Sequence, residues 1–323
     1  MILLLVIKVL LSVNLLLPVT LNAGRKNNES YSFDVIKDKN FNNGFAVSPL
    51  TPKEVIEKGG FKNANIDTLS LLQSKKSPDW QLCQWHSKFP ITKHDLFLNN
   101  DSLIIYKNEA KEIRYNKKDS SILLKVFASK EYYHPRTVNE DWVHLLIQQD
   151  FDKMPNIEKS KHIYLSFSVR LIECENKMKD DEFDSNIHTA QAPFYLYLRN
   201  TNKNSVDYNH ALWLGISTFD YRYPNTLEND NVHLDKGTNT YIYTTSQTEF
   251  WGNISFQDKK WHETSVDIKP IIVKAVEKLK GKNVFNNTSL SDIEITGMNF
   301  GWEIPGTFDA AIVIKAISLN IIE

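Results

Sequence analysis

The stretch HIYLSFSVRL, residues 162–171, alternates apolar and polar side chains with a period of two. Such alternation is typical of a β-strand with one buried and one accessible face. Two further stretches repeat it, APFYLYLRN at residues 192–200 and HALWLGISTFD at residues 210–220. Tyrosine, tryptophan and arginine gather on the accessible side of these stretches. We therefore expect three strands of one sheet that presents an aromatic and polar face.

The composition is that of a globular protein. Of 323 residues, 41% are hydrophobic and 11% are aromatic, which is enough for a sizeable core. The formal net charge is −1, whereas nucleic-acid-binding domains usually carry an excess of basic residues, so we expect no nucleic-acid partner. No zinc-like spacing of His and Cys and no glycine-rich phosphate loop occurs, and the acidic run at residues 180–184 is interpreted as a solvated loop rather than a calcium site. We expect no cofactor and no metal.

The first 23 residues, MILLLVIKVLLSVNLLLPVTLNA, are apolar and end in a small residue, which is typical of a secretory signal peptide. An uncleaved anchor is the alternative, because the run approaches the ~20 residues that span a bilayer. We expect cleavage after Ala23 and a secreted, extracellular protein without membrane contact. Asn-x-Ser/Thr sequons then predict a glycoprotein. These sequons begin at Asn28, Asn100, Asn253, Asn286 and Asn287.

The chain contains two cysteines, Cys83 and Cys174. In an oxidising compartment they can form one disulfide, whereas two buried free thiols are the alternative in a core of this size. We predict the disulfide, because both residues lie near expected strands.

Residues 24–74 are expected to form a loosely held N-terminal arm, because its first part is polar, Asn-rich and without period. The arm includes one short helix. Thr51 to Glu54 has the pattern of a capping box with proline at the first helical position, and Gly59 and Gly60 end the helix.

Residues 75–323 are expected to form one all-β domain. Many short strands, an apolar C-terminal strand at residues 307–319 and a helix between Asp267 and Gly281 predict a two-sheet antiparallel sandwich with one or two accessory helices. The predicted core includes Leu145, Ile147, Leu165, Phe167, Leu196, Leu214, Ile312 and Ile314.

Two stretches, GWEIPGTFDAAIVIKAISL at residues 301–319 and HALWLGISTFDYRY at residues 210–223, resemble the concanavalin A-like jelly rolls of lectins, glucanases and polysaccharide lyases. The resemblance covers residues 75–320 at the level of the superfamily and matches no named family. It implies a curved jelly-roll sandwich whose concave face holds a glycan. Fold alone does not settle function.

We prefer the function of a secreted glycan-binding protein whose partner is a polysaccharide. Aromatic rings would stack on sugar rings, while polar groups bind hydroxyls or carboxylates. We expect the polar residues of the strands to lie on one face, and we make no prediction of oligomeric state. The predicted ligand-binding residues are Trp213, Tyr195, Arg170, Arg199, His188 and Gln191.

Two alternatives remain open. One is a polysaccharide lyase or other carbohydrate-active enzyme on acidic polysaccharide, which needs Tyr or His to move a proton and Gln to stabilise the developing charge. Glu173 and Glu175 share the core parity of their strand, which argues against a catalytic carboxylate pair of the kind that glycosidases use. The other alternative is a secreted structural protein without a glycan ligand. The predicted catalytic residues are His144, Tyr164, Tyr197 and Gln148.

Overall fold

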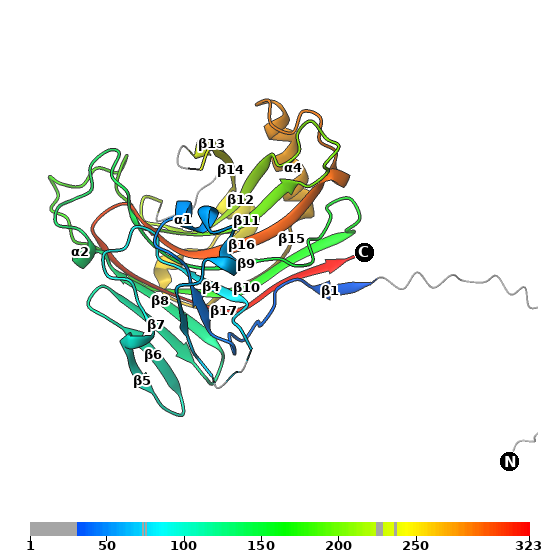
Figure 1. Ribbon diagram of the computed structural model, residues 1–323. Coiled ribbons are helices and arrows are strands. Elements are labelled where there is room, and N and C mark those ends of the chain that lie inside the picture. Colours follow the sequence, from blue (N-terminus) through cyan, green and yellow to red (C-terminus); the bar gives the residue numbers. More distant parts are fainter. Residues whose placement is uncertain (1–30, 73, 75, 224–228, 236–237) are drawn as a thin grey trace, which may run out of the picture. The chain divides into compact units, whose positions relative to one another are not determined.

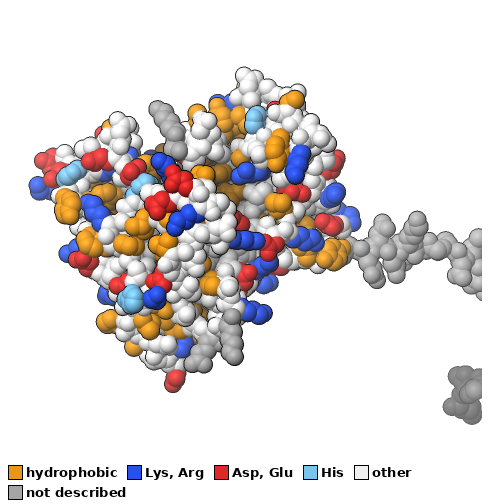
Figure 2. All heavy atoms as spheres, in the orientation of Figure 1, with side chains coloured by type: hydrophobic (Ala, Val, Ile, Leu, Met, Phe, Trp, Pro, Cys, Tyr) orange, Lys and Arg blue, Asp and Glu red, His pale blue; other side chains and the backbone are white. Residues whose placement is uncertain are grey.

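The structure is a computed structural model that describes residues 31–323 except 73, 75, 224–228 and 236–237. The expected signal peptide and the sequon at Asn28 lie outside the described residues. Two large sheets pack face to face, which confirms the predicted all-β sandwich (Figure 1). Acidic and basic side chains are interspersed on the face shown in Figure 2.

The eight-stranded sheet is antiparallel throughout, with β1 beside β17 at one end. The C-terminal strand β17 lies inside this sheet, as predicted from its apolar faces. In spatial order the strands are β15 (His262–Asp267), β10 (His162–Asn176), β17 (Phe308–Ile322), β8 (Ser121–Phe127), β7 (Lys111–Asn116), β6 (Leu103–Lys107) and β5 (Leu96–Asn99), and β1 spans Ser32–Asp34.

The nine-stranded sheet contains two parallel pairs, β12 with β14 and β2 with β4, and its other ladders are antiparallel. The predicted antiparallel arrangement therefore holds except at these two pairs. In spatial order the strands are β13 (Asn231–Asp235), β14 (Thr240–Thr245), β12 (Ala211–Asp220), β11 (Gln191–Asn200), β16 (Ile293–Ile304), β9 (Val143–Asp150), β4 (Trp80–Cys83), β2 (Phe45–Val47) and β3 (Asp67–Leu69).

Within the described residues, four α-helices accompany the sheets where one or two were predicted: α1 (Pro52–Glu57), α2 (Ala128–Glu131), α3 (Gln247–Trp251) and α4 (Lys269–Lys280). The predicted cap of α1 is confirmed, because the Thr51 side chain accepts a hydrogen bond from the Glu54 backbone N–H. The cap of α4 is Ile268 rather than Asp267. None of the helices in the described ranges is long and apolar enough to cross a bilayer.

The core lies between the two sheets and contains every core residue that was predicted. Phe167 of β10 stacks on Phe194 of β11 across the interface, with ring centroids 4.9 Å apart. Trp302 of β16 is fully buried, and its Nε1 donates to the Leu124 carbonyl of β8 at 3.0 Å. This bond joins the two sheets and satisfies a polar group that would otherwise be costly to bury.

The described residues between 31 and 74 belong to the sandwich, so the prediction of a loose arm before a domain at residue 75 is wrong. The compact unit begins at Tyr31. Strand β1 pairs with β17 in one sheet, while β2 and β3 extend the other, and Phe41 and Phe45 are fully buried. Strands of only three residues are too short to show an alternating pattern, which explains the error.

Strand β10 does not share a sheet with β11 and β12, so the prediction of one sheet for these three strands is wrong. It lies between β15 and β17 in the eight-stranded sheet. Residues 177–190 then carry the chain to the nine-stranded sheet. Alternation specifies which side chains are buried but not which strand is the neighbour. His162, Tyr164 and Arg170 are therefore on the opposite outer face from Tyr195 and Tyr197.

The predicted disulfide is wrong as well, because both cysteines are free thiols in the structure. Cys83 belongs to β4 in the nine-stranded sheet and packs against Val55 and Leu146. Cys174 belongs to β10 in the eight-stranded sheet. The assignment of β10 to the other sheet separates the two side chains.

Candidate functional site

The candidate site lies on the outer face of the nine-stranded sheet, the face turned away from the core. At the side of β4 and β9, α1 and the turn after it cover this face, because Val55, Ala64 and Trp85 pack against Cys83 and Leu146 (Figure 1). The outward side chains of β9, β16, β11 and β12 form three rows across the sheet, which we describe in order.

The first row, which we call the Glu303 row, crosses four neighbouring strands. Glu303 of β16 pairs in register with His144 of β9 on one side and with Gln191 of β11 on the other. Gln191 pairs in turn with Asp220 of β12. Side chains at paired positions of neighbouring strands lie within contact distance, so the row brings a carboxyl, an imidazole and an amide together.

Hydrogen bonds fix one end of the Glu303 row. Gln191 Nε2 donates to Glu303 Oε2 at 2.8 Å, and Arg222 Nη2 donates to Gln191 Oε1 at 3.3 Å. Arg222 also forms an ion pair with Asp220 at 2.6 Å, and Thr189 donates to the same carboxylate. The guanidinium therefore orients the amide so that its N–H group points at Glu303.

The electrostatics of this row favour proton transfer near neutral pH. Burial raises the pKa of Glu303 to about 7; the neighbouring carboxylates add to this, and the hydrogen bond from Gln191 opposes it. Burial and the charge of His86 lower the pKa of His144 to about 3. At pH 7 the imidazole of His144 is therefore neutral, and the carboxyl group of Glu303 beside it is partly protonated, so it can donate or accept a proton.

The second row, the Asn299 row, contains unpartnered hydrogen-bond acceptors. It runs from Gln81 through Gln148 and Asn299 to Tyr195 and Gly215. Gln81 Oε1 and Asn299 Oδ1 are buried and have no hydrogen-bond partner. Such groups are costly unless a ligand or water satisfies them. A Cβ on Gly215 would lie 2.9 Å from the Tyr195 ring, so glycine is what lets this ring lie across β12.

The third row, which contains Asp150, Tyr197 and Trp213, supplies an aromatic platform. The Trp213 ring lies 5.6 Å from the Tyr195 ring and 5.4 Å from the Tyr197 ring, centroid to centroid. The Tyr197 hydroxyl donates to Gln148 Oε1 at 3.2 Å, which links this row to the Asn299 row. Burial raises the pKa of both tyrosines well above the ordinary value, so both hydroxyls remain protonated at neutral pH.

Seven of the predicted site residues lie on this face, but the predicted catalytic group does not converge. Gln148 contacts Tyr197, whereas His144 is four residues away on β9, roughly 13 Å along the strand, beside Glu303. Arg199 is exposed at the far end of β11. The seven are His144, Gln148, Gln191, Tyr195, Tyr197, Arg199 and Trp213.

The other predicted residues lie elsewhere. Tyr164 and Arg170 belong to the opposite sheet, which is incompatible with a shared site. His188 is buried in the loop before β11, where its Nδ1 accepts from the Asp184 N–H at 3.0 Å and its Nε2 contacts the Arg136 carbonyl at 2.7 Å, so it holds the loop. Glu173 forms an ion pair with Lys125 at 2.5 Å. Over the described part of the chain, no cluster of three or more His, Cys, Asp or Glu could hold a metal ion.

Sequence reasoning missed Glu303, Asn299 and Arg222. The signal for the first two was present in MNFGWEI, residues 298–304, where Met, Phe, Trp and Ile alternate with Asn, Gly and Glu. These residues form the second half of β16, which ends at Ile304. Arg222 follows β12 in a turn, and nothing in the sequence relates it to Gln191.

No family model matches the chain, and no curated protein matches it. Solved structures that do match include the endoglucanase cel12A from Rhodothermus marinus, at 11% identity over 68% of this chain and 91% of that chain, with a TM-score of 0.39. A family 12 xyloglucanase from Bacillus licheniformis matches at 14% identity over 70% and 96%, with a TM-score of 0.41. The xyloglucanase domain of NopAA from Sinorhizobium fredii matches at 10% identity over 69% and 95%, with a TM-score of 0.35. These values are too low to transfer the role of any residue to this chain.

Proposed function

We propose that the outer face of the nine-stranded sheet binds a glycan. The observation that carries this proposal is the pair of buried, unpartnered acceptors, Asn299 Oδ1 and Gln81 Oε1, in the row next to the Trp213 platform. Sugar hydroxyls can donate to such acceptors while the apolar face of a sugar ring stacks on an aromatic side chain. On a purely structural face, only water could satisfy these acceptors.

The dimensions of the face suit an extended ligand. The Glu303 row and the third row are separated by six residues along β9, from His144 to Asp150, which is roughly 20 Å. The sheet fixes the spacing of the rows, so the site is largely formed before the ligand arrives. A short oligosaccharide segment can therefore contact the carboxyl row and the aromatic platform together.

Electrophoresis in native gels that contain xyloglucan, β-glucan, alginate or polygalacturonate tests the acceptors. At least one polysaccharide should retard the wild-type protein, and Asn299→Ala should weaken that retardation about tenfold, the effect expected for a buried hydrogen bond. Asn204→Ala, an amide deletion in an exposed loop, is the matched control and should change nothing. Equal retardation of Asn299→Ala and wild type would show that this row does not contact the glycan.

A second candidate function, cleavage of the bound glycan, is favoured by the raised pKa of Glu303. A carboxyl group that titrates near neutrality can act as a general acid or base. Asp220, the other carboxylate of the row, is held by Arg222 and Thr189. Glu303 is therefore our candidate for the proton-transferring group, with His144 beside it as a neutral hydrogen-bonding group.

Incubation with the same polysaccharides separates binding from cleavage. If Glu303 transfers a proton, wild type should release new reducing ends or an unsaturated, ultraviolet-absorbing product, and Glu303→Gln should abolish product while retardation in the gel persists. If wild type is retarded but forms no product from any of the polysaccharides, the protein binds glycans without cleaving them, and the catalytic proposal is wrong.

We also propose that the protein acts outside the cell. The apolar N-terminus supports this proposal, as do the exposed sequon residues Asn100, Asn253 and Asn286. N-terminal sequencing of the product exported by a eukaryotic host should begin near Gly24, and removal of N-glycans should lower its mass. A chain that begins at Met1 and stays in the membrane fraction would contradict this proposal.

A further inference from the structure

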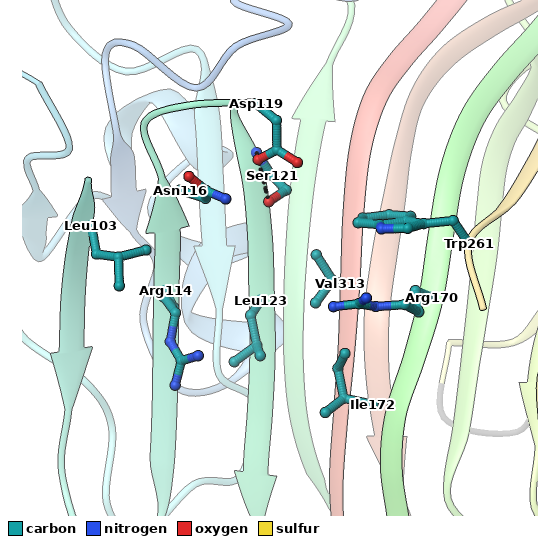
Figure 3. Close-up of a pocket in the computed structure, with 10 residues that line it drawn as sticks. All are labelled: Leu103, Arg114, Asn116, Asp119, Ser121, Leu123, Arg170, Ile172, Trp261 and Val313. Carbon is teal, nitrogen blue, oxygen red and sulfur yellow. Dashed lines mark hydrogen bonds between the residues drawn. The ribbon is translucent and has the colours of Figure 1, made fainter. Parts of the chain in front are cut away.

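A cavity of about 340 Å³ opens on the outer face of the eight-stranded sheet, on the other side of the sandwich from the glycan face (Figure 3). It lies over β6, β7, β8, β17 and β10, and Trp261 rises at one side. Its lining combines polar and charged side chains with aliphatic ones, which are unusual on an exposed sheet face. The aliphatic residues are Leu103, Leu123, Ile172 and Val313.

Arg170 enters this cavity from β10 and is stacked on Trp261. The guanidinium carbon lies 5.2 Å from the Trp261 ring centroid, and Figure 3 shows the two side chains extending side by side toward Val313. Lys315 Nζ lies 4.5 Å from the same ring. The stacking holds the planar guanidinium in one orientation, which lowers the entropy lost when it binds a ligand.

Arg170 is also the cation of the cavity whose charge is not balanced. Its Nε is buried without a hydrogen-bond partner, and within the described ranges no carboxylate forms an ion pair with it. The other cations are paired, since Arg114 Nε donates to Glu112 at 2.9 Å and Lys315 contacts Asp119 at 3.3 Å. A buried guanidinium N–H without an acceptor is costly, and an anionic ligand would remove that cost.

We propose that this cavity is a second ligand site, which binds a carboxylate carried on a ring of sugar size, as in a uronic acid. The fork of Arg170 suits the two oxygens of a carboxylate. The cavity is far larger than a bare anion needs, and its aliphatic floor at Leu123 and Val313 fits the C–H face of a pyranose ring. At the rim, Asn116 supplies a polar group for the ring hydroxyls, and Ser121, whose hydroxyl donates to Asp119 at 2.8 Å, can accept from one.

Titration with methyl glucuronide, followed by the indole N–H signal of Trp261 in an NMR spectrum, tests the proposal. Trp261→Phe assigns the signal. Glucuronide should shift it saturably, and Arg170→Gln should weaken the affinity about tenfold or more. Lys203→Gln, which removes a cation from an exposed loop, is the control and should leave the affinity unchanged. Thermal melting of both variants verifies that they fold.

The choice of probe separates the parts of the proposal. Methyl glucoside, which has the ring without the carboxylate, should bind at least tenfold more weakly, and acetate or inorganic phosphate should also bind more weakly than glucuronide. No saturable shift with glucuronide, an unchanged affinity in Arg170→Gln, or equal binding of glucoside or bare phosphate would each overturn the site. If Arg199→Gln rather than Arg170→Gln weakened the affinity, the carboxylate would bind on the outer face of the nine-stranded sheet and not in this cavity.

Discussion

Gln191 joins Glu303 across strands β11 and β16 through a hydrogen bond of 2.8 Å from Nε2 to Oε2. Because Arg222 binds the other end of the same amide, the donor is directed at the carboxyl group. Burial nonetheless raises the pKa of Glu303 to about 7, so desolvation outweighs this single neutral hydrogen bond. The protonation state of Glu303 at neutral pH depends on this balance between burial and the hydrogen bond from Gln191.

The raised pKa of Glu303 predicts a dependence of stability on pH. The ordinary pKa is 4.5, so between that pH and about 7 the folded state holds a proton that the unfolded state has lost. The contribution of Glu303 to the free energy of unfolding is therefore fully present below pH 4.5 and is lost as pH rises to about 7. Glu303→Gln keeps an acceptor for Gln191 and cannot ionise. Relative to wild type it should gain about 3 kcal/mol on going from pH 4.5 to pH 8, as measured by urea unfolding. A difference that stays constant with pH would contradict the assignment.

Trp302 should be a major contributor to stability, because its indole fills the core and its N–H bonds the opposite sheet. Trp302→Phe should lower the free energy of unfolding by about 2–3 kcal/mol, through the cavity and the lost bond to Leu124. Trp142→Phe serves as a control for loss of an indole N–H without loss of a bond, because the partly exposed Trp142 has no partner at Nε1. Equal losses in the two variants would argue against a role for the cross-sheet bond.

Lys111 and Glu131 form a fully buried ion pair that Ser87 also contacts, between β7 and α2. Lys111→Met leaves the Glu131 carboxylate buried without its cation and should cost about 3–5 kcal/mol. The double variant Lys111→Met with Glu131→Gln should recover much of that loss in urea unfolding. Lys53→Met, at an exposed ion pair with Glu57, should cost less than about 1 kcal/mol. A double variant no more stable than the single one would show that the cost is packing rather than charge.

The two thiols should be free and unreactive in the folded protein. Burial raises the pKa of Cys83 and of Cys174 to about 12, so neither forms a thiolate at neutral pH. Reaction with a thiol reagent should be slow in buffer and reach two equivalents in denaturant without reductant. If no thiol reacts with the reagent in denaturant, the two cysteines form a disulfide and this prediction is wrong.

The sequence showed which side of each strand is buried, but it did not show which strands are neighbours in a sheet. Alternation placed Leu165, Phe167, Leu196 and Leu214 correctly in the core, because the period of a strand is fixed by its backbone. It could not show that β10 and β11 belong to different sheets, because pairing depends on the path of the segment between them. For the same reason the aromatic residues of β11 and β12 were found, while the partners of Glu303, which come from three other strands, required the register.

The most direct test of the glycan face is the retardation of wild type, Trp213→Ala and Phe97→Ala in native gels that contain neutral and acidic polysaccharides. Phe97 is a 70% exposed aromatic residue on β5 of the other sheet, so it controls for nonspecific stacking. Binding on the outer face of the nine-stranded sheet predicts that at least one polysaccharide retards wild type and Phe97→Ala equally, and that Trp213→Ala weakens this binding about tenfold, as expected for loss of a stacking ring. Migration of wild type unchanged by every polysaccharide, or retardation that survives in Trp213→Ala, would contradict it.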